Sequence, residues 1–237
     1  MNDTLKQLQS VLPTRLRHCP WLDDLDLRPH SVAPKTVLYR PGSVPSRIYF
    51  VVKGWVAGAV DLSPKTRPFC ALRIRGDVIG LNCLPERKAA EEVVTITACD
   101  LVSVPSQQVR KLVGEHAELR DYVHENLTRD INTLQIMNAV IGRLKAPERL
   151  AYFLYILLQR SKRNADGPMD TLVLPMTQDE IGQMLGLTNV SVNRAFRKLE
   201  SDLLIRTGRQ SVTFLDEDHF VRELSFETKR DLIKQVT

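Results

Sequence analysis

A cluster of basic side chains near the C-terminal end of the chain has the composition of a surface that binds an acidic partner. Two acids, Glu200 and Asp202, stand among five cations, which are Arg194, Arg197, Lys198, Arg206 and Arg209. Guanidinium, ammonium and amide groups are the side chains that contact phosphates and base edges in DNA. The whole chain carries 33 basic and 28 acidic residues. This excess of positive charge is small, so its location is better evidence for an acidic partner than its size.

The pattern around these cations predicts two short helices joined by a tight turn. Thr177 and Glu180 have the spacing of a capping box that begins the first helix, and Gly186 ends it. Thr188 is expected to cap the second helix. The apolar residues of that second helix recur at intervals of four, three and four, and they form its predicted buried stripe: Val192, Phe196, Leu199 and Leu203.

The opposite face of the second helix has the polarity of a helix that reads a DNA major groove. It holds Val190, Arg194, Arg197 and Ser201, flanked by Ser191, Asn193 and Lys198. Val190 either contacts a thymine methyl group or is an ordinary solvent-exposed valine. Beyond Ile205, a turn centred on Gly208 predicts a hairpin, or wing, that carries Arg206 and Arg209. A basic face that serves only solubility is the alternative, which two capped helices followed by a hairpin disfavour.

The first half of the chain is rich in short strand-like segments. Between about Val32 and Val104, turn residues separate runs of β-branched and aromatic residues, which are VLY, RIYFVV, WVAGAV, FCALRI, EVVTITA and LVSV. This spacing predicts a small antiparallel roll or barrel. One long helix is then expected from about Glu118 to Leu144, and another from Pro147 to about Arg160.

Apolar residues on the long helix alternate at spacings of four and three, which is typical of helices that pair. This seam consists of Leu127, Ile131, Leu134, Asn138 and Ile141. A second stripe consists of Tyr122, Ile136, Val140 and Leu144. The two stripes favour a helix buried on two sides, against its own roll and against a partner. Packing on its own core alone is the alternative.

Composition and motifs exclude several other classes. The N-terminus has no uninterrupted apolar region of a signal peptide, and no segment approaches the roughly 20 apolar residues of a membrane span, so we expect a cytoplasmic protein without a membrane partner. The sequence shows no catalytic motif and no metal-ligand spacing of its histidines, so we expect neither catalytic residues nor a metal site. A regulatory ligand-binding module that acts on a protein partner is the alternative function.

The segment IGQMLGLTNVSVNRAFRKLE resembles the helix-turn-helix signature of the Crp-Fnr superfamily. Upstream, VLYRPGSVPSRIYFVVKGWVAGAVDL and LRIRGDVIG resemble the cyclic-nucleotide-binding-like roll of that family, including Gly42, Gly54, Gly76 and Gly80. The resemblance runs from about Val37 to Phe220. It implies an α+β fold with an N-terminal helix and antiparallel β-roll sensor domain (1–115), a long dimerisation helix (116–145), and a winged helix-turn-helix domain with a C-terminal tail (146–237).

The resemblance also implies a transcription regulator that binds near-palindromic operator DNA as a homodimer, with RNA polymerase as a further partner. Arg194 matches a family arginine that reads guanine, and the seam of the long helix is the expected dimer interface. Many members have a glutamate where this chain has Val190, so the familiar half-site does not carry over. The expected DNA-binding set is Thr177, Gln178, Thr188, Asn189, Val190, Ser191, Asn193, Arg194, Arg197, Lys198 and Arg209.

The sensor residues depart from those of cyclic-AMP-binding members. Those members have a Gly-Glu pair and an Arg-Ser or Arg-Thr pair in the roll, where this chain has Gly80-Leu81 and Ala89-Ala90 followed by Glu91-Glu92. Two acids beside a phosphate site repel the ligand, so we do not expect classical cyclic-AMP binding. A shifted loop would leave a weaker candidate effector pocket with Gly80, Leu81, Arg87 and Lys88, and the effector is unknown.

The four cysteines suggest no assembled cofactor site. Only Cys19 lies near the N-terminus, so we do not expect the iron-sulfur cluster of oxygen-sensing members. His18-Cys19-Pro20 is either a haem-ligand motif or, more simply, a bend before an aromatic anchor at Trp21. Redox sensing remains open, and it needs a thiolate beside a cation. The candidate thiols are Cys70, Cys83 and Cys99, and the candidate cations are Arg73, Arg75 and Arg87. The tail Ser225–Thr237 has the pattern of an added amphipathic helix.

Overall fold

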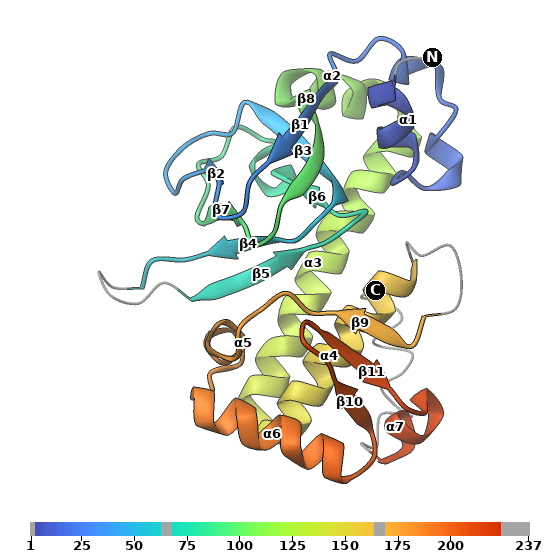
Figure 1. Ribbon diagram of the computed structural model, residues 1–237. Helices are drawn as coiled ribbons and strands as arrows, with labels where there is room; N and C mark the ends of the chain where they lie inside the picture. The colour runs from blue at the N-terminus through green and yellow to red at the C-terminus, as the bar shows by residue number, and fades with distance from the viewer. Residues whose placement is uncertain (1–2, 63–67, 164–168, 224–237) are drawn as a thin grey trace. The chain divides into compact units, whose positions relative to one another are not determined.

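The computed structural model describes residues 3–62, 68–163 and 169–223, and the chain forms two compact units that divide between Thr128 and Arg129. The first unit contains two four-stranded antiparallel sheets (Figure 1). One has the order β1-β8-β3-β6, with β1 Arg28–Val32, β3 Arg47–Lys53, β6 Val78–Ile79 and β8 Cys99–Pro105. The other has the order β2-β7-β4-β5, with β2 Val37–Tyr39, β4 Val56–Ala59, β5 Phe69–Arg73 and β7 Glu92–Thr95. This architecture confirms the predicted β-roll.

Alternation along the strands divides the apolar residues of this unit between two cores. On β3, Ile48 and Phe50 belong to a core shared with the N-terminal helices, whereas Tyr49 and Val51 lie with residues of both sheets in the interior of the roll. The helices that cover the outer core are α1 Asp3–Gln9, α2 Ser106–Glu115, the first part of α3 Ala117–Arg143, and the short 3-10 turns η1 Thr14–Leu16, η2 Pro20–Leu22 and η3 Leu81–Cys83. Trp21 is buried there, as the anchor interpretation predicts.

Two strands of the roll have no signal in the sequence pattern. The sequence predicts strands only from about Val32, whereas β1 already begins at Arg28 and contains Pro29. β1 pairs with β8 alone, and the edge of a sheet is where a strand tolerates proline, which lacks an N–H. β6 is two residues long and pairs only with β3, so it is too short to show a period. Tertiary pairing, and not local propensity, makes both segments strands.

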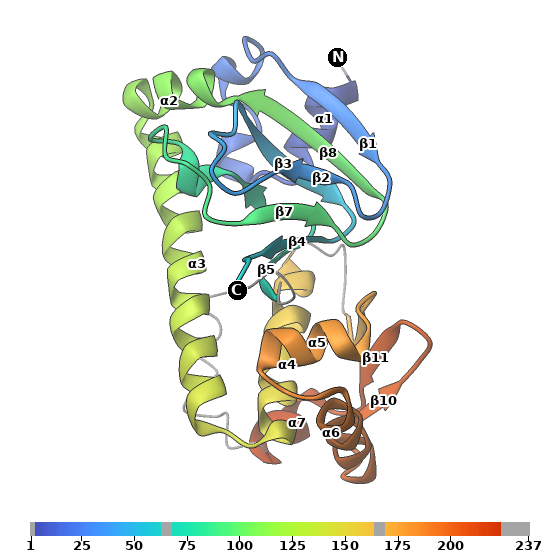
Figure 2. The same cartoon turned by 90° about the vertical axis from the view of Figure 1, so that its left-hand side faces the viewer.

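The second unit is a helical domain (Figure 2) with a three-stranded sheet of order β10-β11-β9, whose strands are labelled in Figure 1. Its elements are α4 Ala146–Arg163, β9 Thr171–Val173, α5 Gln178–Leu185, α6 Asn189–Ser201, β10 Ile205–Thr207, β11 Ser211–Phe214 and α7 Glu217–Glu223. Helix α4 packs against α6 and β9 and is buried along most of its length, so it serves as the core element. Gln159 of α4 donates a 2.7 Å hydrogen bond to the carboxylate of Glu217 on α7.

The predicted helix in Ser225–Thr237 lies outside the described residues. Within the described ranges, no helix has both the length and the apolar character needed to cross a membrane.

Candidate nucleic-acid interface

The turn between α5 and α6 follows from local interactions that the sequence predicts. The hydroxyl of Thr177 accepts a hydrogen bond from the Glu180 amide, and the Glu180 carboxylate accepts one from the Thr177 amide at 2.7 Å, which confirms the capping box. Helix α5 ends at Gly186, whose φ of +63° is left-handed and favours glycine. At Gly182 a Cβ would lie 2.6 Å from the Leu187 carbonyl oxygen, so this tight turn also excludes a side chain there.

Helix α6 begins at the predicted cap, since the hydroxyl of Thr188 accepts a hydrogen bond from the Ser191 amide. Val192, Phe196 and Leu199 are buried as expected, together with Ala195. The prediction for Leu203 was wrong, because this side chain is 70% exposed. The helix ends at Ser201 and the chain turns at Leu203 with φ +56°, which places the next residue, Leu204, in the core. Helical periodicity no longer applies beyond the last helical residue.

The face of α6 away from the core is open. Asn189, Val190, Arg194, Arg197 and Lys198 are all exposed. Lys198 forms an ion pair with Asp202 at 2.6 Å, whereas Arg194 has no salt-bridge partner among the described residues. Of the flanking polar side chains, Ser191 and Asn193 are half-buried: the Ser191 hydroxyl lies 2.9 Å from that of Thr188, and the Asn193 amide donates to the Gln178 side chain at 3.4 Å.

The predicted wing is a hairpin of β10 and β11, in which Ile205 pairs with Phe214 and Thr207 with Val212. The amide of Gly208 donates to the Ser211 carbonyl oxygen at 2.8 Å and closes the turn. Arg206 and Arg209 are exposed on this hairpin. β11 also pairs with β9, so the wing is anchored at its inner strand while β10 forms the edge of the sheet.

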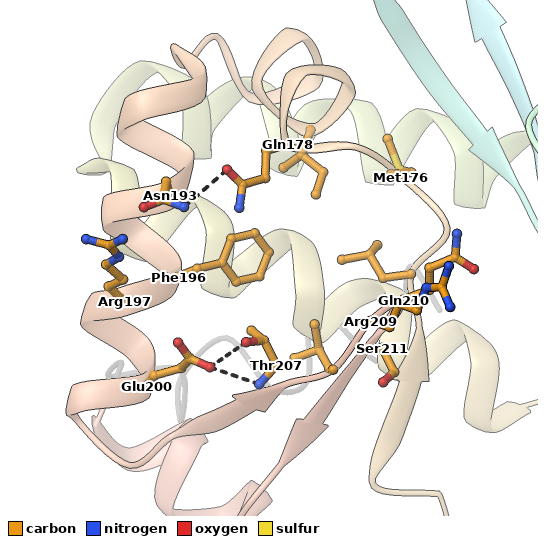
Figure 3. Close-up of a pocket in the computed structure, with 14 residues that line it drawn as sticks. Met176, Gln178, Asn193, Phe196, Arg197, Glu200, Thr207, Arg209, Gln210 and Ser211 are labelled. Atoms are coloured by element: carbon orange, nitrogen blue, oxygen red, sulfur yellow. Dashed lines mark hydrogen bonds between the residues drawn. The ribbon is translucent and has the colours of Figure 1, made fainter.

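A cleft of about 280 Å³ separates α6 from the wing (Figure 3). Side chains with hydrogen-bond donors line it from three elements: Gln178 of α5, Asn193 and Arg197 of α6, and Thr207, Arg209, Gln210 and Ser211 of the wing. Phe196, Leu174 and Val212 are among the apolar residues that line it. The arrangement presents a polar, predominantly cationic groove beside an exposed helix face.

Glu200 lies in the same cleft and is a residue that sequence reasoning counted only as a charge opposing the cations. Its carboxylate accepts hydrogen bonds from the backbone amide of Thr207, at 3.0 Å, and from the Thr207 hydroxyl. These bonds, together with nearby Arg197, hold the pKa of Glu200 below its usual value. The sequence does show a glutamate seven residues before a threonine of the predicted wing. This spacing is too common to predict a hydrogen bond between the two residues.

Two domain matches define the class of protein to which this arrangement belongs. Residues 148–222 match the family model of the Crp-like helix-turn-helix domain, and residues 29–116 match that of the cyclic nucleotide-binding domain. The chain is a member of the Crp-Fnr superfamily of transcription regulators and has a helix-turn-helix DNA-binding domain.

Individual relatives are similar over most of the chain. The transcriptional regulatory protein btr of Bordetella pertussis is 26% identical over 196 residues, which are 82% of this chain and 80% of that protein. The transcriptional activatory protein AadR of Rhodopseudomonas palustris is 27% identical over 191 residues, 79% of this chain and 77% of that protein. The structure of FixK2 from Bradyrhizobium japonicum has the same fold, with a TM-score of 0.73 at 22% identity over 84% of this chain and 97% of that chain.

The predicted dimer seam differs in exposure along α3. Ile131 and Leu134 are 54% and 56% exposed, and Asn138 is exposed as well. Leu127 is half-buried against the outer core of the first unit. Ile141 is half-buried, with its Cγ2 3.7 Å from the position that a Cβ on Gly186 would take. The stretch from Ile131 to Asn138 is therefore the part of the seam that presents apolar surface.

The residues of the weaker effector pocket do not share one surface. Leu81 belongs to the outer core, whereas Arg87 and Lys88 are exposed. Gly80 has a φ of +95°, and a Cβ there would approach the Ile48 Cδ1 atom to 3.2 Å. Leu81 is therefore a packing residue and does not contribute to a polar pocket with the two cations.

The cysteines lack the environment of a reactive thiolate. Desolvation and the nearby Glu91 carboxylate raise the pKa of Cys70 to about 11, although Arg73 opposes this shift. Burial likewise raises the pKa values of Cys83 and Cys99. Near Cys19, burial and then Glu118 raise the thiol pKa. The pKa of the thiol is thus raised at each of the four cysteines, which disfavours the thiolate that redox sensing needs.

Proposed function

We propose that this regulator binds near-palindromic operator DNA as a cytoplasmic homodimer, with RNA polymerase as a further partner. The observation that carries the proposal is the continuity of donor groups from the exposed face of α6 through the cleft to the wing. A major groove accepts one helix, and the flanking backbone accepts cations on either side of it. In a symmetric dimer the two recognition helices would enter grooves about 34 Å apart.

The residues divide into two roles in this proposal. The base-facing start of α6 consists of Asn189, Val190, Ser191, Asn193 and Arg194; within it, the Ser191 hydroxyl touches the DNA backbone. Those around the rim contact phosphates, and they are Thr177, Gln178, Thr188, Arg197, Lys198 and Arg209. The free guanidinium of Arg194 supports the first role, since a bidentate contact to guanine needs an unpaired arginine. The exposed cations of the wing support the second.

The exposed seam of α3 supports the homodimer. Ile131 and Leu134 are large apolar side chains one turn apart on α3, and both are more than half exposed. Asn138 follows at the next seam position, where a polar residue fixes the register of paired helices. A second copy of the same helix is the partner that such a stripe fits, with Leu127 and Ile141 at its ends.

The charge in the roll supports a signal other than cyclic AMP. A Cβ at Gly58 would lie 1.9 Å from the Glu91 carboxylate, so this acid lies directly against β4. Its charge contributes to the raised pKa values of the Cys70 and Cys83 thiols. Glu92 is buried beside it, 3.8 Å from Arg40. The Glu91 carboxylate against β4 disfavours a cyclic phosphate in this part of the roll, and we expect titration calorimetry with cyclic AMP to show no binding.

Electrophoretic mobility shifts on selected genomic fragments test the DNA proposal. Affinity should fall with salt at a log-log slope of about −0.9 per phosphate contacted. Arg194→Ala should cost about 1 to 3 kcal/mol on the selected site and relax its preference at one base pair, while Arg209→Ala should weaken specific and random DNA alike. Arg222→Ala changes an exposed arginine of α7 outside the proposed interface; it is the matched control and should change neither.

The same measurement separates the two levels of the proposal. Equal losses on specific and random DNA would remove Arg194 from base reading but leave the DNA-binding function intact. A wild-type chain that retains no duplex at low salt would contradict the function itself and favour a module that acts on a protein.

A further inference from the structure

The link between Glu200 and Thr207 joins the helix that faces the groove to the hairpin beside it. Glu200 is in the last turn of α6, and Thr207 is the last residue of β10 before the turn that carries Arg209. A single oxygen, Oε1 of Glu200, accepts both the backbone amide and the hydroxyl of Thr207. Figure 3 shows these two bonds closing one end of the cleft. They connect the last turn of α6 to the outer strand of the wing, in addition to the turn at residues 202–204 and the packing of α6 against β10.

The wing needs such a link because its outer strand is short and lies at an edge. β10 has three residues, and only β11 pairs with it. The amide of Thr207 is a donor on the free side of this edge strand, and the Glu200 carboxylate satisfies it. A charged acceptor makes this hydrogen bond stronger than a neutral one. The link therefore fixes the hairpin at the base of its turn.

The charge of Glu200 is otherwise difficult to reconcile with the cleft. A carboxylate repels phosphates, and this one lies in the groove that Arg197 and Arg209 also line. Its lowered pKa keeps it ionised at neutral pH. A carboxylate with no structural contact at this place would only weaken DNA binding. The bonds of Glu200 to Thr207 are a structural contact through which this residue can also favour binding.

We propose that Glu200 is a positioning residue that fixes the wing, and with it Arg209, relative to the recognition helix. This inference rests on the proposed DNA-binding function for its consequence, but the link itself can be measured without DNA. Glu200 touches no phosphate or base in this proposal and acts only through Thr207.

The first test follows the Thr207 amide in the full-length protein by NMR hydrogen exchange without DNA. Glu200→Ala should speed exchange by about tenfold, the loss expected for one charge-assisted hydrogen bond. Glu200→Gln keeps an Oε1 acceptor and should retain most of the protection. Asp202→Ala is the matched control, since Asp202 pairs with Lys198 on the same helix. Unchanged exchange in Glu200→Ala would overturn the inference.

The second test is a double-mutant cycle on DNA affinity. Glu200→Ala and Arg209→Ala should each weaken specific and random DNA about tenfold, and the double variant should lose no more than either alone. Arg194→Ala should instead act additively with Glu200→Ala. Glu200→Gln should bind at least as well as wild type, because it keeps the link and removes a negative charge.

The two tests distinguish failure of the Glu200 inference from failure of the proposed DNA-binding function. If Glu200→Ala and Glu200→Gln both tighten DNA binding, Glu200 is only a repulsive charge and the inference is wrong. Additive losses in the Glu200→Ala, Arg209→Ala pair also overturn it. If wild type binds no DNA, the proposed function fails, while the amide measurement still decides whether Glu200 holds the wing.

Discussion

Val190 is an exposed apolar residue on the face of α6 that we propose reads the operator. It is 60% exposed at the first turn of α6, although a valine gains nothing from water contact. In a major groove the thymine C5-methyl is the apolar group that such a side chain meets. The structure confirms the exposure, and the contact with thymine stays a prediction.

Base replacement tests that contact at the level of one methyl group. Changing the contacted thymine to deoxyuridine should cost about 0.8 kcal/mol, roughly fourfold in Kd, on wild type. Val190→Ala should lose most of this sensitivity, because its shorter side chain no longer reaches the methyl. Thymines elsewhere in the same site provide the control. If no position responds in wild type, Val190 is simply an exposed valine.

Cys70 shows how one neighbouring acid sets the chemistry of a thiol. Its sulfur lies 3.7 Å from the Glu91 carboxylate, and its pKa is about 11. The thiolate is the reactive form, so at pH 7 roughly one thiol in ten thousand is ready to react. Exposure alone therefore does not make this cysteine a sensor.

Alkylation by iodoacetamide should be slow at pH 7 and should rise about tenfold per pH unit until the pH approaches the pKa. Glu91→Gln should lower the pKa of Cys70 and speed labelling at pH 7, since it removes a negative charge. The rate is measured by mass spectrometry of the peptide that contains Cys70. Rapid labelling of wild type at pH 7 would restore the redox hypothesis for this thiol.

At the scale of elements, the end of α6 combines a backbone cost with an unsupported side chain. Leu203 adopts a φ of +56°, a conformation that favours glycine or asparagine, and its side chain is 70% exposed. The exposed Leu203 side chain gains little packing that would offset this cost. The turn is nevertheless required, because it brings Leu204 into the core and starts β10 at Ile205.

Leu203→Gly should therefore stabilise the second unit by about 1 kcal/mol, the left-handed penalty of a branched residue less the added chain entropy of glycine. Hydrogen exchange of peptides within residues 178–221, measured across a urea series, follows the stability of this unit. Leu204→Ala is the contrasting variant, and its loss should be about 2 to 5 kcal/mol. A destabilised Leu203→Gly would show that the exposed side chain makes a contact that the fold requires.

At the scale of the whole molecule, the proposed dimer is what presents two recognition helices to one operator. Ile131→Glu together with Leu134→Glu places two like charges from each copy in the seam, so we expect a monomer. Multi-angle light scattering gives the mass, and the same variant should bind the operator far more weakly than wild type because only one half-site is engaged at a time. Ala139→Glu, an exposed site off the seam, is the control. A double variant that remains dimeric would move the interface elsewhere.

What the sequence determined by itself is the part of the protein governed by neighbours along the chain. The cap residues Thr177 and Thr188, the end of α5 at Gly186 and the buried stripe from Val192 to Leu199 are local features, since a helix repeats every 3.6 residues and its caps act within one turn. The same locality made the helix-turn-helix, the roll and the family recognisable.

Only the tertiary structure decided which distant groups meet. It made strands of β1 and β6, whose pairing partners lie far away in the sequence, and it turned Leu203 outward where the helical period stops. It also placed Glu91 against Gly58 and Glu200 against Thr207. The sequence shows that these two acids are present, but only the structure shows which groups they contact. Hydrogen bonds and ion pairs act over a few ångströms, and the separation of two residues along the chain does not determine their distance in space.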